Sequence, residues 1–281
     1  MLANQFYKPK NIDEVVRLLS QKKTAKILAG GTDLIIALRE RKMNTDAIID
    51  ISDIPELKQI STDGNSLHIG SVSNFNQIES DKVIRKYCPI LAEAASQIGG
   101  PAIRSRATIG GNIANNAAAG DMIPVLLALD AIAVVINPYQ RKVMPVGEIV
   151  NLGLSTDELI IEFIIHIHEH PFMKFEKIGR RKALAISRVN LAVVMTFSEN
   201  KSISGCAIGI GAVGKTAYRL NEIEQYLIGK QLNDEIIEEA ARKTDFIVFE
   251  NLGTRKTAPY KRKIAATLMK NILEIAMEDF E

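Results

Sequence analysis

The chain has 281 residues, 47% of them hydrophobic, which is enough for two domains or for one large and one small domain. Its 35 Lys and Arg against 33 Asp and Glu give a formal net charge of +2, with both signs interleaved along the sequence, which argues against a nucleic-acid-binding surface. The longest apolar stretch, residues 123–136, is interrupted by Pro124 and Asp130 and is too short for a membrane span of roughly 20 residues, and the N-terminal MLANQFYKPK contains no apolar signal region, so we expect a cytoplasmic protein.

The N-terminal part of the sequence alternates between helical and extended patterns. Asn11 precedes an amphipathic segment and predicts a capped helix. A short apolar run then meets Gly30-Gly31, after which Thr32 or Asp33 can cap a second helix, so the pattern is strand, glycine turn and helix. The strands expected here cover residues 25–28, 47–52 and 66–72, and the second helix ends near residue 41.

The rest of the chain predicts one long helix, several strands and a helical C-terminus. A helix over 78–98 ends at Gly99-Gly100-Pro101, and Pro171 breaks the chain after a β-branched strand. We therefore place a domain boundary near 171–175, which divides the chain into residues 1–173 and 174–281. Further strands are expected at 131–137 and 158–170, an antiparallel hairpin at 189–197 and 202–213, and helices at 219–229, 232–243 and 259–278.

Two glycine pairs follow apolar runs, in residues 28–34 (LAGGTDL) and in residues 108–112 (TIGGN). Paired glycines let a backbone approach a ligand closely, and neighbouring hydroxyl or amide groups can bind phosphate oxygens. A tight strand-to-helix turn also needs glycine, so each pair alone has a purely structural interpretation. Together, the two pairs favour a pyrophosphate-containing ligand held between two loops.

Three stretches carry a resemblance to a known family: AGGTDLI (29–35), TIGGNIANNAAAGDMIPVLLALDA (108–131) and FEKIGRRKALAISRVNLA (175–192). The sequence resembles, over essentially its full length, the FAD-binding or medium subunit of molybdenum hydroxylases such as xanthine dehydrogenase, nicotinate dehydrogenase and aerobic carbon monoxide dehydrogenase. The resemblance implies an α+β fold. It comprises a two-lobed FAD-binding domain of the PCMH type, followed by a small C-terminal domain with an antiparallel sheet and a helical bundle.

The resemblance also implies which residues bind FAD. Loop 29–33 and the Thr-x-Gly-Gly-Asn segment would wrap the pyrophosphate, Asp121 would bind a ribose hydroxyl, and Leu159 would contact the adenine side. Lys177 and Ile186 would approach the flavin, where Lys177 can stabilise negative charge on the reduced ring. Asp121 alternatively reads as a cap for the helix that follows it. The full candidate set is Leu28, Ala29, Gly30, Gly31, Thr32, Asp33, Leu34, Gly99, Thr108, Gly110, Gly111, Asn112, Asp121, Leu159, Lys177 and Ile186. Ala114 stands where larger relatives place an Ile near the flavin.

The implied activity is that of an oxidoreductase subunit that passes electrons from iron–sulfur clusters of a partner through FAD to NAD⁺ or another acceptor. Cys88 and Cys206 are too few for a cluster or a disulfide framework, so a 2Fe-2S subunit and a molybdenum-cofactor subunit would be the partners. Two alternatives stay open. One is a stand-alone FAD-dependent reductase or oxidase, and the other is a non-catalytic assembly module that binds no flavin.

Three further patterns have functional and structural interpretations. Residues 209–216 (GIGAVGKT) match the P-loop pattern, but a P-loop opens a parallel βα domain and only a mostly helical tail follows, so we expect no nucleotide there. His166, His168 and His170 alternate on one strand face and could bind a metal, but we favour the exposed end of an edge strand. Four arginines could steer a nucleotide or dock a partner, although a solvated face is the simpler interpretation. These are Arg104, Arg106, Arg180 and Arg181.

Overall fold

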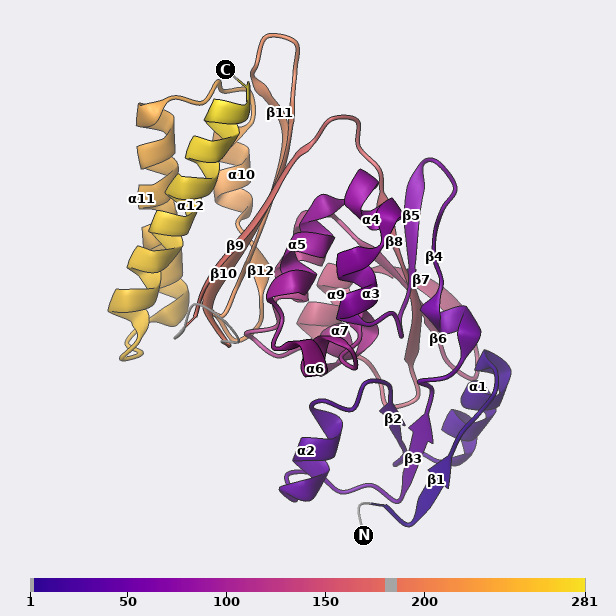
Figure 1. Ribbon diagram of the computed structural model, residues 1–281. Helices are drawn as coiled ribbons and strands as arrows, with labels where there is room; N and C mark the ends of the chain where they lie inside the picture. The colour runs from indigo at the N-terminus through magenta and orange to yellow at the C-terminus, as the bar shows by residue number, and fades with distance from the viewer. Residues whose placement is uncertain (1–2, 180–185, 281) are drawn as a thin grey trace.

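The computed structural model describes residues 3–179 and 186–280, and Figure 1 shows its three sheets and the helices that cover them. The first sheet is parallel, in the order β1-β3-β2, and lies in the N-terminal lobe (indigo in Figure 1). Its strands are β1 (Gln5–Tyr7), β2 (Lys26–Leu28) and β3 (Ala47–Asp50). Its helices are α1 (Ile12–Gln21) and α2 (Leu34–Arg39).

Helix α1 begins where the sequence predicts it. The Asn11 side chain accepts a hydrogen bond from the Glu14 amide at 2.9 Å, which is the expected N-cap geometry. Val15 and Leu19, one turn apart, are fully buried against the first sheet's core.

The second sheet is antiparallel with the order β4-β5-β8-β6-β7. Side chains on one face of β5 and β8, such as Leu67 and Phe163, join the core beneath the helices, while Leu159 and Ile161 face the N-terminal lobe. The strands are β4 (Ile60–Thr62), β5 (Ser66–Gly70), β6 (Ile132–Ile136), β7 (Arg141–Pro145) and β8 (Leu159–His166). A 3-10 helix, η1 (Pro55–Lys58), precedes β4.

The helix predicted over 78–98 is wrong as a single element, because three short helices occupy this region. The Asp81 side chain accepts hydrogen bonds from the Val83 and Ile84 amides and so starts a new helix, and Pro89 starts a third because it has no amide hydrogen. The helices are α3 (Phe75–Ser80), α4 (Lys82–Tyr87) and α5 (Pro89–Gln97). They are followed by α6 (Pro101–Arg104), α7 (Ile109–Asn115), α8 (Met122–Ala128) and α9 (Val146–Leu152), and this last helix was not predicted.

The C-terminal sheet has the order β12-β11-β10-β9 and is entirely antiparallel. The predicted hairpin is confirmed, since Leu191 of β10 pairs with Ile210 of β11. The strands are β9 (Phe172–Gly179), β10 (Ser187–Phe197), β11 (Ile203–Gly211) and β12 (Tyr218–Arg219). The helices are α10 (Asn221–Leu227), α11 (Asp234–Leu252), which runs well beyond the predicted end at 243, and α12 (Ala258–Phe280).

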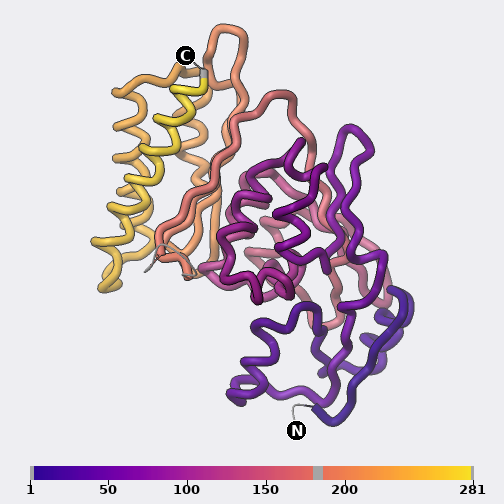
Figure 2. Tube along the Cα trace, viewed as in Figure 1, coloured from indigo at the N-terminus to yellow at the C-terminus, as the bar shows by residue number. Residues whose placement is uncertain are grey.

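Strand β10 is buried on both faces. Val189, Leu191 and Val193 pack against the core of α10 to α12, whereas Ala192 and Val194 face the core that contains α5 and α8. Figure 2 shows the same arrangement, with the orange and yellow helices on one side of the sheet and the magenta helices on the other. This double burial explains the continuous apolar run VNLAVVM. Within the described ranges, no helix is both long and apolar enough to cross a membrane.

Candidate functional site

A cavity of about 560 Å³ lies between the N-terminal lobe and the start of α7. The loop after β2 lines one side, and the glycine pair at the start of α7 lines the other. Eleven of the predicted residues line it: Ala29, Gly30, Gly31, Thr32, Asp33, Leu34, Thr108, Gly110, Gly111, Asn112 and Leu159. Leu28 lies just behind this lining, since a Cβ on Gly31 would be 2.9 Å from Leu28 Cδ1.

The glycines of the cavity have different tasks. A Cβ on Gly30 would lie 2.0 Å from the Arg106 carbonyl oxygen, and a Cβ on Gly110 would lie 2.7 Å from the Ser71 carbonyl oxygen, so both glycines allow two segments to touch. Gly31 has a φ of +74°, a conformation that favours glycine. Gly111 differs from these three, because the nearest atom to its Cβ position is the Thr108 hydroxyl.

The two loops offer different hydrogen-bonding groups to the cavity. At the start of α7, Gly110 donates to the Ser71 carbonyl at 2.8 Å and Gly111 donates to Thr108 Oγ1 at 3.1 Å, so these amides are already paired. Helix α2 has no side-chain cap, and within the described part of the chain nothing accepts a hydrogen bond from the amides of residues 30–33. The unpaired amides therefore belong to the first loop.

Two buried side-chain oxygens at the cavity also have no partner among the described residues: Ser71 Oγ and Asn112 Oδ1. A buried polar atom without a hydrogen bond costs about 1–3 kcal/mol, which makes such atoms rare unless a ligand or water completes them. Ser71 was not predicted, because a serine after a short strand belongs to no motif, and it reaches the cavity through the long-range pairing of its carbonyl with Gly110.

Glu158 contributes a carboxylate to the cavity wall. It forms an ion pair with Lys142 at 2.6 Å and accepts a hydrogen bond from the Ser155 amide at 2.9 Å. Burial alone would raise the pKa of this carboxyl, but the Lys142 and Ser155 hydrogen bonds outweigh burial and hold the pKa below its ordinary value. The side chain is therefore ionised at neutral pH.

The other predicted residues form a second group, outside the cavity lining. Asp121 Oδ2 accepts from Lys177 Nζ at 2.7 Å, and Asp121 Oδ1 accepts from Ser187 Oγ at 2.5 Å and from Asn190 Nδ2 at 2.6 Å. Lys177 also donates to the Gln97 carbonyl at 2.8 Å. The network joins α5, α8, β9 and β10, and Asp121 does not cap α8 through its side chain, so the capping interpretation is wrong.

Gly99 and Ile186 stand close in sequence to this network. Gly99 has a φ of +48° and follows Gln97 by two residues, while Ile186 precedes Ser187 and is 81% exposed. Ser187 and Asn190 were not predicted individually. They lie inside the third family-like stretch, but their bonds to Asp121 depend on a contact between segments 66 or more residues apart.

The P-loop-like stretch serves sheet packing. A Cβ on Gly209 would lie 2.1 Å from the Pro124 carbonyl oxygen, and a Cβ on Gly211 would lie 2.2 Å from Asn190 Oδ1. Both glycines thus allow β11 to approach α8 and β10. Strand β11 is antiparallel to both of its neighbours, whereas a P-loop follows a parallel strand and opens a helix.

The alternating histidines lie at the end of β8. The His166 and His168 rings are in edge contact, with centroids 4.9 Å apart, and burial together with the His166 charge lowers the pKa of His168. Strand β8 is central in its sheet, so the expected edge position is wrong. Among the described residues, no group of three or more His, Cys, Asp or Glu is placed to hold a metal ion.

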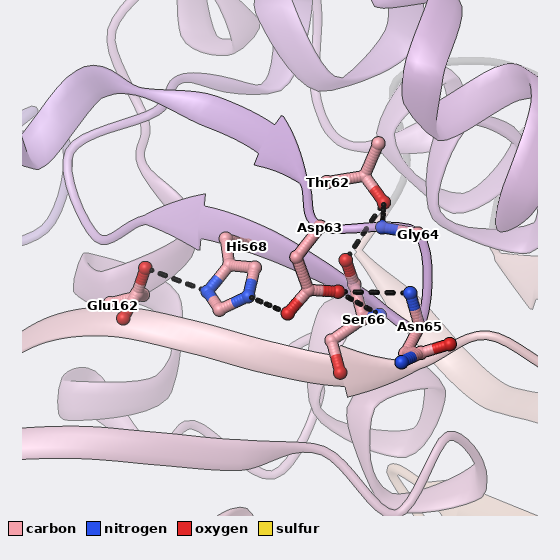
Figure 3. Close-up of polar contacts among 7 residues, drawn as sticks. All are labelled: Thr62, Asp63, Gly64, Asn65, Ser66, His68 and Glu162. Atoms are coloured by element: carbon pink, nitrogen blue, oxygen red, sulfur yellow. Dashed lines mark hydrogen bonds and ion pairs between the residues drawn. The ribbon is translucent and has the colours of Figure 1, made fainter.

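Figure 3 shows a separate polar cluster around His68. Its Nδ1 lies 3.1 Å from Glu162 Oε1 and its Nε2 lies 3.4 Å from Asp63 Oδ2. The Asp63 carboxylate also accepts from the Ser66 and Asn65 amides, which lower its pKa further than His68 does. Because none of these residues lines the cavity, the cluster serves to hold the β4–β5 turn onto β8.

Two of the four arginines are engaged with the protein. Arg104 bonds the Gly99 carbonyl at 3.2 Å and Glu79 at 3.1 Å, with only 16% of its side chain exposed, so the solvated-face interpretation is wrong for it. Arg106 donates to the Gly30 carbonyl at 3.3 Å and so ties the two loops together. Arg180 and Arg181 lie outside the described residues.

Both cysteines behave as apolar side chains. Cys88 is buried, and burial raises the pKa of its thiol well above the ordinary value. Burial likewise raises the pKa of Cys206 to about 12, so neither thiol is reactive at neutral pH.

Comparison with known proteins gives two family matches that together span most of the chain. Residues 2–167 match the FAD binding domain in molybdopterin dehydrogenase, and residues 174–276 match the CO dehydrogenase flavoprotein C-terminal domain. The nicotinate dehydrogenase FAD-subunit of Eubacterium barkeri is 30% identical over 99% of this chain and 97% of its own length. The carbon monoxide dehydrogenase medium chain of Hydrogenophaga pseudoflava is 31% identical over 97% of this chain and 96% of its own length.

Structural comparison agrees. A solved structure of carbon monoxide dehydrogenase from Hydrogenophaga pseudoflava superposes with a TM-score of 0.90 at 29% identity, covering 97% of this chain and 96% of that one. The predicted α+β fold, with a flavin-binding part followed by a sheet-and-helix part, is confirmed. The chain belongs to the family of FAD-binding medium subunits of molybdenum hydroxylases, and it is a flavoprotein component of an oxidoreductase.

Proposed function

We propose that the cavity between the β2–α2 loop and α7 binds the pyrophosphate and adenosine part of FAD. The observation that carries the proposal is the set of unpaired amides at residues 30–33, opposite the partnerless oxygens of Ser71 and Asn112. Amides and hydroxyls can donate to phosphate oxygens without a buried lysine, and the Asn112 carbonyl oxygen can accept from a ribose hydroxyl. The residues present therefore fit the cofactor.

The two loops would divide the work. The first loop supplies donors, while Gly111 and Gly110 at the start of α7 supply close approach, since their own amides are paired within the protein. This differs from the sequence-based expectation that both glycine turns donate backbone N–H groups. Leu159, at the start of β8, stays a candidate contact on the adenine side because it lines the same cavity.

We propose further that the flavin ring lies toward the second group of residues. FAD, when bound, supplies the one- and two-electron chemistry of the subunit. Lys177 places a buried positive charge there, and the exposed Ile186 offers an apolar surface on which a flat ring can pack. For Asp121 to bind a ribose hydroxyl as well, Oδ1 would have to accept a third hydrogen bond beside Ser187 and Asn190.

In the proposed activity, the subunit receives electrons from iron–sulfur clusters of a 2Fe-2S partner and passes them to NAD⁺ or another acceptor. Substrate oxidation would take place on a molybdenum-cofactor subunit of the same complex. Resemblance to named medium chains and FAD-subunits supports a role as one component of such an assembly. A cytoplasmic location and a domain division at residues 173/174 remain predictions, and this division would fall within β9.

The test is the flavin content of the purified chain. We expect a yellow protein that releases FAD on denaturation, and loss of the colour in Gly111→Val, whose side chain would project into the cavity. Gly147→Val is the matched control, because a Cβ there meets only Leu127 at 3.6 Å and the residue does not line the cavity. A colourless wild-type chain that does not take up added FAD, or equal FAD loss in both variants, would contradict the proposal.

A second measurement separates the subunit role from a stand-alone flavoenzyme. We expect the FAD-loaded chain to co-purify with two further chains and to be reduced slowly by NADH without them. Rapid reduction and turnover of the isolated chain with NADH would instead favour a stand-alone reductase.

A further inference from the structure

The first turns of α12 carry positive charge where a helix favours negative charge. The segment from 255 to 263, RKTAPYKRK, contains five cationic residues and no acidic one, and the first turn of α12 contains no acid. Because the N-terminus of a helix is the positive end of its dipole, Asp or Glu is stabilising there and Lys or Arg is not. Sequences break such local rules mainly at functional sites.

Part of this charge is compensated and part is not. Arg262 and Lys263 both pair with Asp245 of α11. Lys261 points the other way and donates to the Ala212 carbonyl, at the end of β11. In the described ranges, no carboxylate pairs with Lys261, Arg188 or Arg255, and the charges that act on the Lys261 ammonium are those of Arg188 and Arg255, which lower its pKa together with burial.

These three cations come from three separate segments. Arg188 belongs to the start of β10 and lies over the Tyr260 ring, with its Cζ 5.4 Å from the ring centroid. Arg255 belongs to the turn between α11 and α12, and Lys261 to the first turns of α12. Their convergence is therefore a product of the tertiary fold, unlike a run of lysines along one exposed helix.

We propose that Arg188, Arg255 and Lys261 form a binding site for a phosphate dianion, outside the flavin cavity. A phosphate carries nearly two negative charges and several acceptor oxygens at neutral pH, which suits two guanidinium groups and one ammonium better than a single carboxylate does. Each cation has N–H groups directed away from its neighbours' charge, and the half-buried Lys261 suits a small anion. The phosphate can be free or can belong to a nucleotide.

The site is connected to the flavin-binding part of the chain. Ala212, whose carbonyl accepts from Lys261, donates its own amide to the Ala118 carbonyl at 2.6 Å. Ala118 lies in the connection between α7 and α8, which leaves the cavity at one end and reaches Asp121 at the other. A phosphate-bearing molecule held at this cluster would therefore bind beside the FAD-binding segment without occupying its cavity.

The experiment is calorimetric titration of the FAD-saturated chain with inorganic phosphate and, separately, with ADP, at constant ionic strength. FAD saturation keeps the probes out of the cavity. We expect saturable binding of phosphate that Arg188→Gln and Arg255→Gln each weaken about tenfold, since each removes one charge-assisted contact. ADP binding much tighter than phosphate would identify a nucleotide as the source, and equal affinities would identify free phosphate or a simple ester.

Lys263→Gln is the matched control. It removes one positive charge from the same helical turn, but Lys263 faces Asp245 and not the cluster. Phosphate affinity should stay within about twofold of the wild type in this variant. An absence of saturable binding, or equal weakening by Lys263→Gln and Arg255→Gln, would overturn the proposal, as would preference for a polyglutamate peptide over phosphate and ADP.

Failure of this site is distinguishable from failure of the flavin site, because flavin absorbance is recorded on the same samples. Arg255 is exposed in a turn, so Arg255→Gln should fold, keep FAD and lose phosphate. If the wild-type chain holds no FAD but still binds phosphate in an Arg255-dependent manner, the flavin proposal fails and the phosphate site stands.

Discussion

The Asp121 carboxylate of α8 and the Lys177 ammonium of β9 form an ion pair at 2.7 Å, with only 8% and 10% of the two side chains exposed. The sequence comparison assigns these residues to different parts of one cofactor, but in the folded chain they neutralise each other. Ser187 and Asn190 complete the hydrogen bonding of Asp121 from β10. A buried pair with this many partners links the flavin-binding part of the chain to the C-terminal sheet.

Asp121→Ala should therefore destabilise the chain strongly. Removing the carboxylate leaves the Lys177 ammonium buried without its counter-charge, which typically costs about 3–5 kcal/mol. Adding Lys177→Met should recover part of this loss, and urea denaturation of both single variants and the double variant measures the coupling. The exposed Lys8–Asp53 pair, 2.6 Å long, is the control, and Asp53→Ala should cost less than about 1 kcal/mol. Strictly additive effects of Asp121→Ala and Lys177→Met would refute the coupling.

Gly209→Ala should cost stability although it adds only one methyl group. The new Cβ would lie 2.1 Å from the Pro124 carbonyl oxygen, so β11 or α8 must shift, and overpacking of this kind typically costs about 1–3 kcal/mol. Lys215→Ala, at an exposed position of the same motif, should leave stability unchanged and should not alter ATP or GTP binding. Thermal unfolding of both variants, with a nucleotide titration, is the measurement. Loss of ATP or GTP binding in Lys215→Ala would restore the P-loop interpretation.

Sequence patterns predicted the elements whose causes are local. The Asn11 cap, the β10–β11 hairpin and the glycine turns all follow from neighbouring residues, and the structure contains them. The helix expected over 78–98 failed for a local reason as well, because the capping ability of Asp81 and the missing amide of Pro89 were given less weight than the apolar spacing.

What could not be predicted depends on contacts between distant segments. The central position of β8 follows from its pairing with both β5 and β6, which no single strand pattern specifies. Ser71 and Asn190 became candidate residues only when the fold placed them at the cavity and on Asp121. The engagement of Arg104 with Gly99 and Glu79 is of the same kind, since an arginine in sequence shows charge but not its partner.

Glu158 makes the stability of the chain pH-dependent in the acid range. Its folded-state pKa is lowered, so its contribution is fully present above the unfolded-state pKa of about 4.3 and is lost as pH falls through the lower folded-state value. Glu158→Gln should therefore be less stable than the wild type at pH 6 to 7, and the difference in melting temperature should shrink below about pH 4. The measurement is thermal unfolding of both proteins across this range. A difference that stays constant down to pH 3 would mean that the ionised form of Glu158 makes no special contribution.

Ser71→Ala should weaken FAD binding without weakening the fold. Ser71 Oγ is buried and has no partner in the described protein, so removing it breaks no hydrogen bond of the FAD-free chain. If that hydroxyl donates to the cofactor, its loss should cost about 1 kcal/mol or more of binding, a five- to tenfold rise in Kd. Ser73→Ala is the matched control, because Ser73 Oγ donates to the Lys58 carbonyl at 3.3 Å and does not line the cavity, so this variant should lose stability and keep its FAD affinity. Flavin fluorescence titration and urea denaturation of both variants measure the two effects, and equal FAD affinity in Ser71→Ala and the wild type would remove Ser71 from the site.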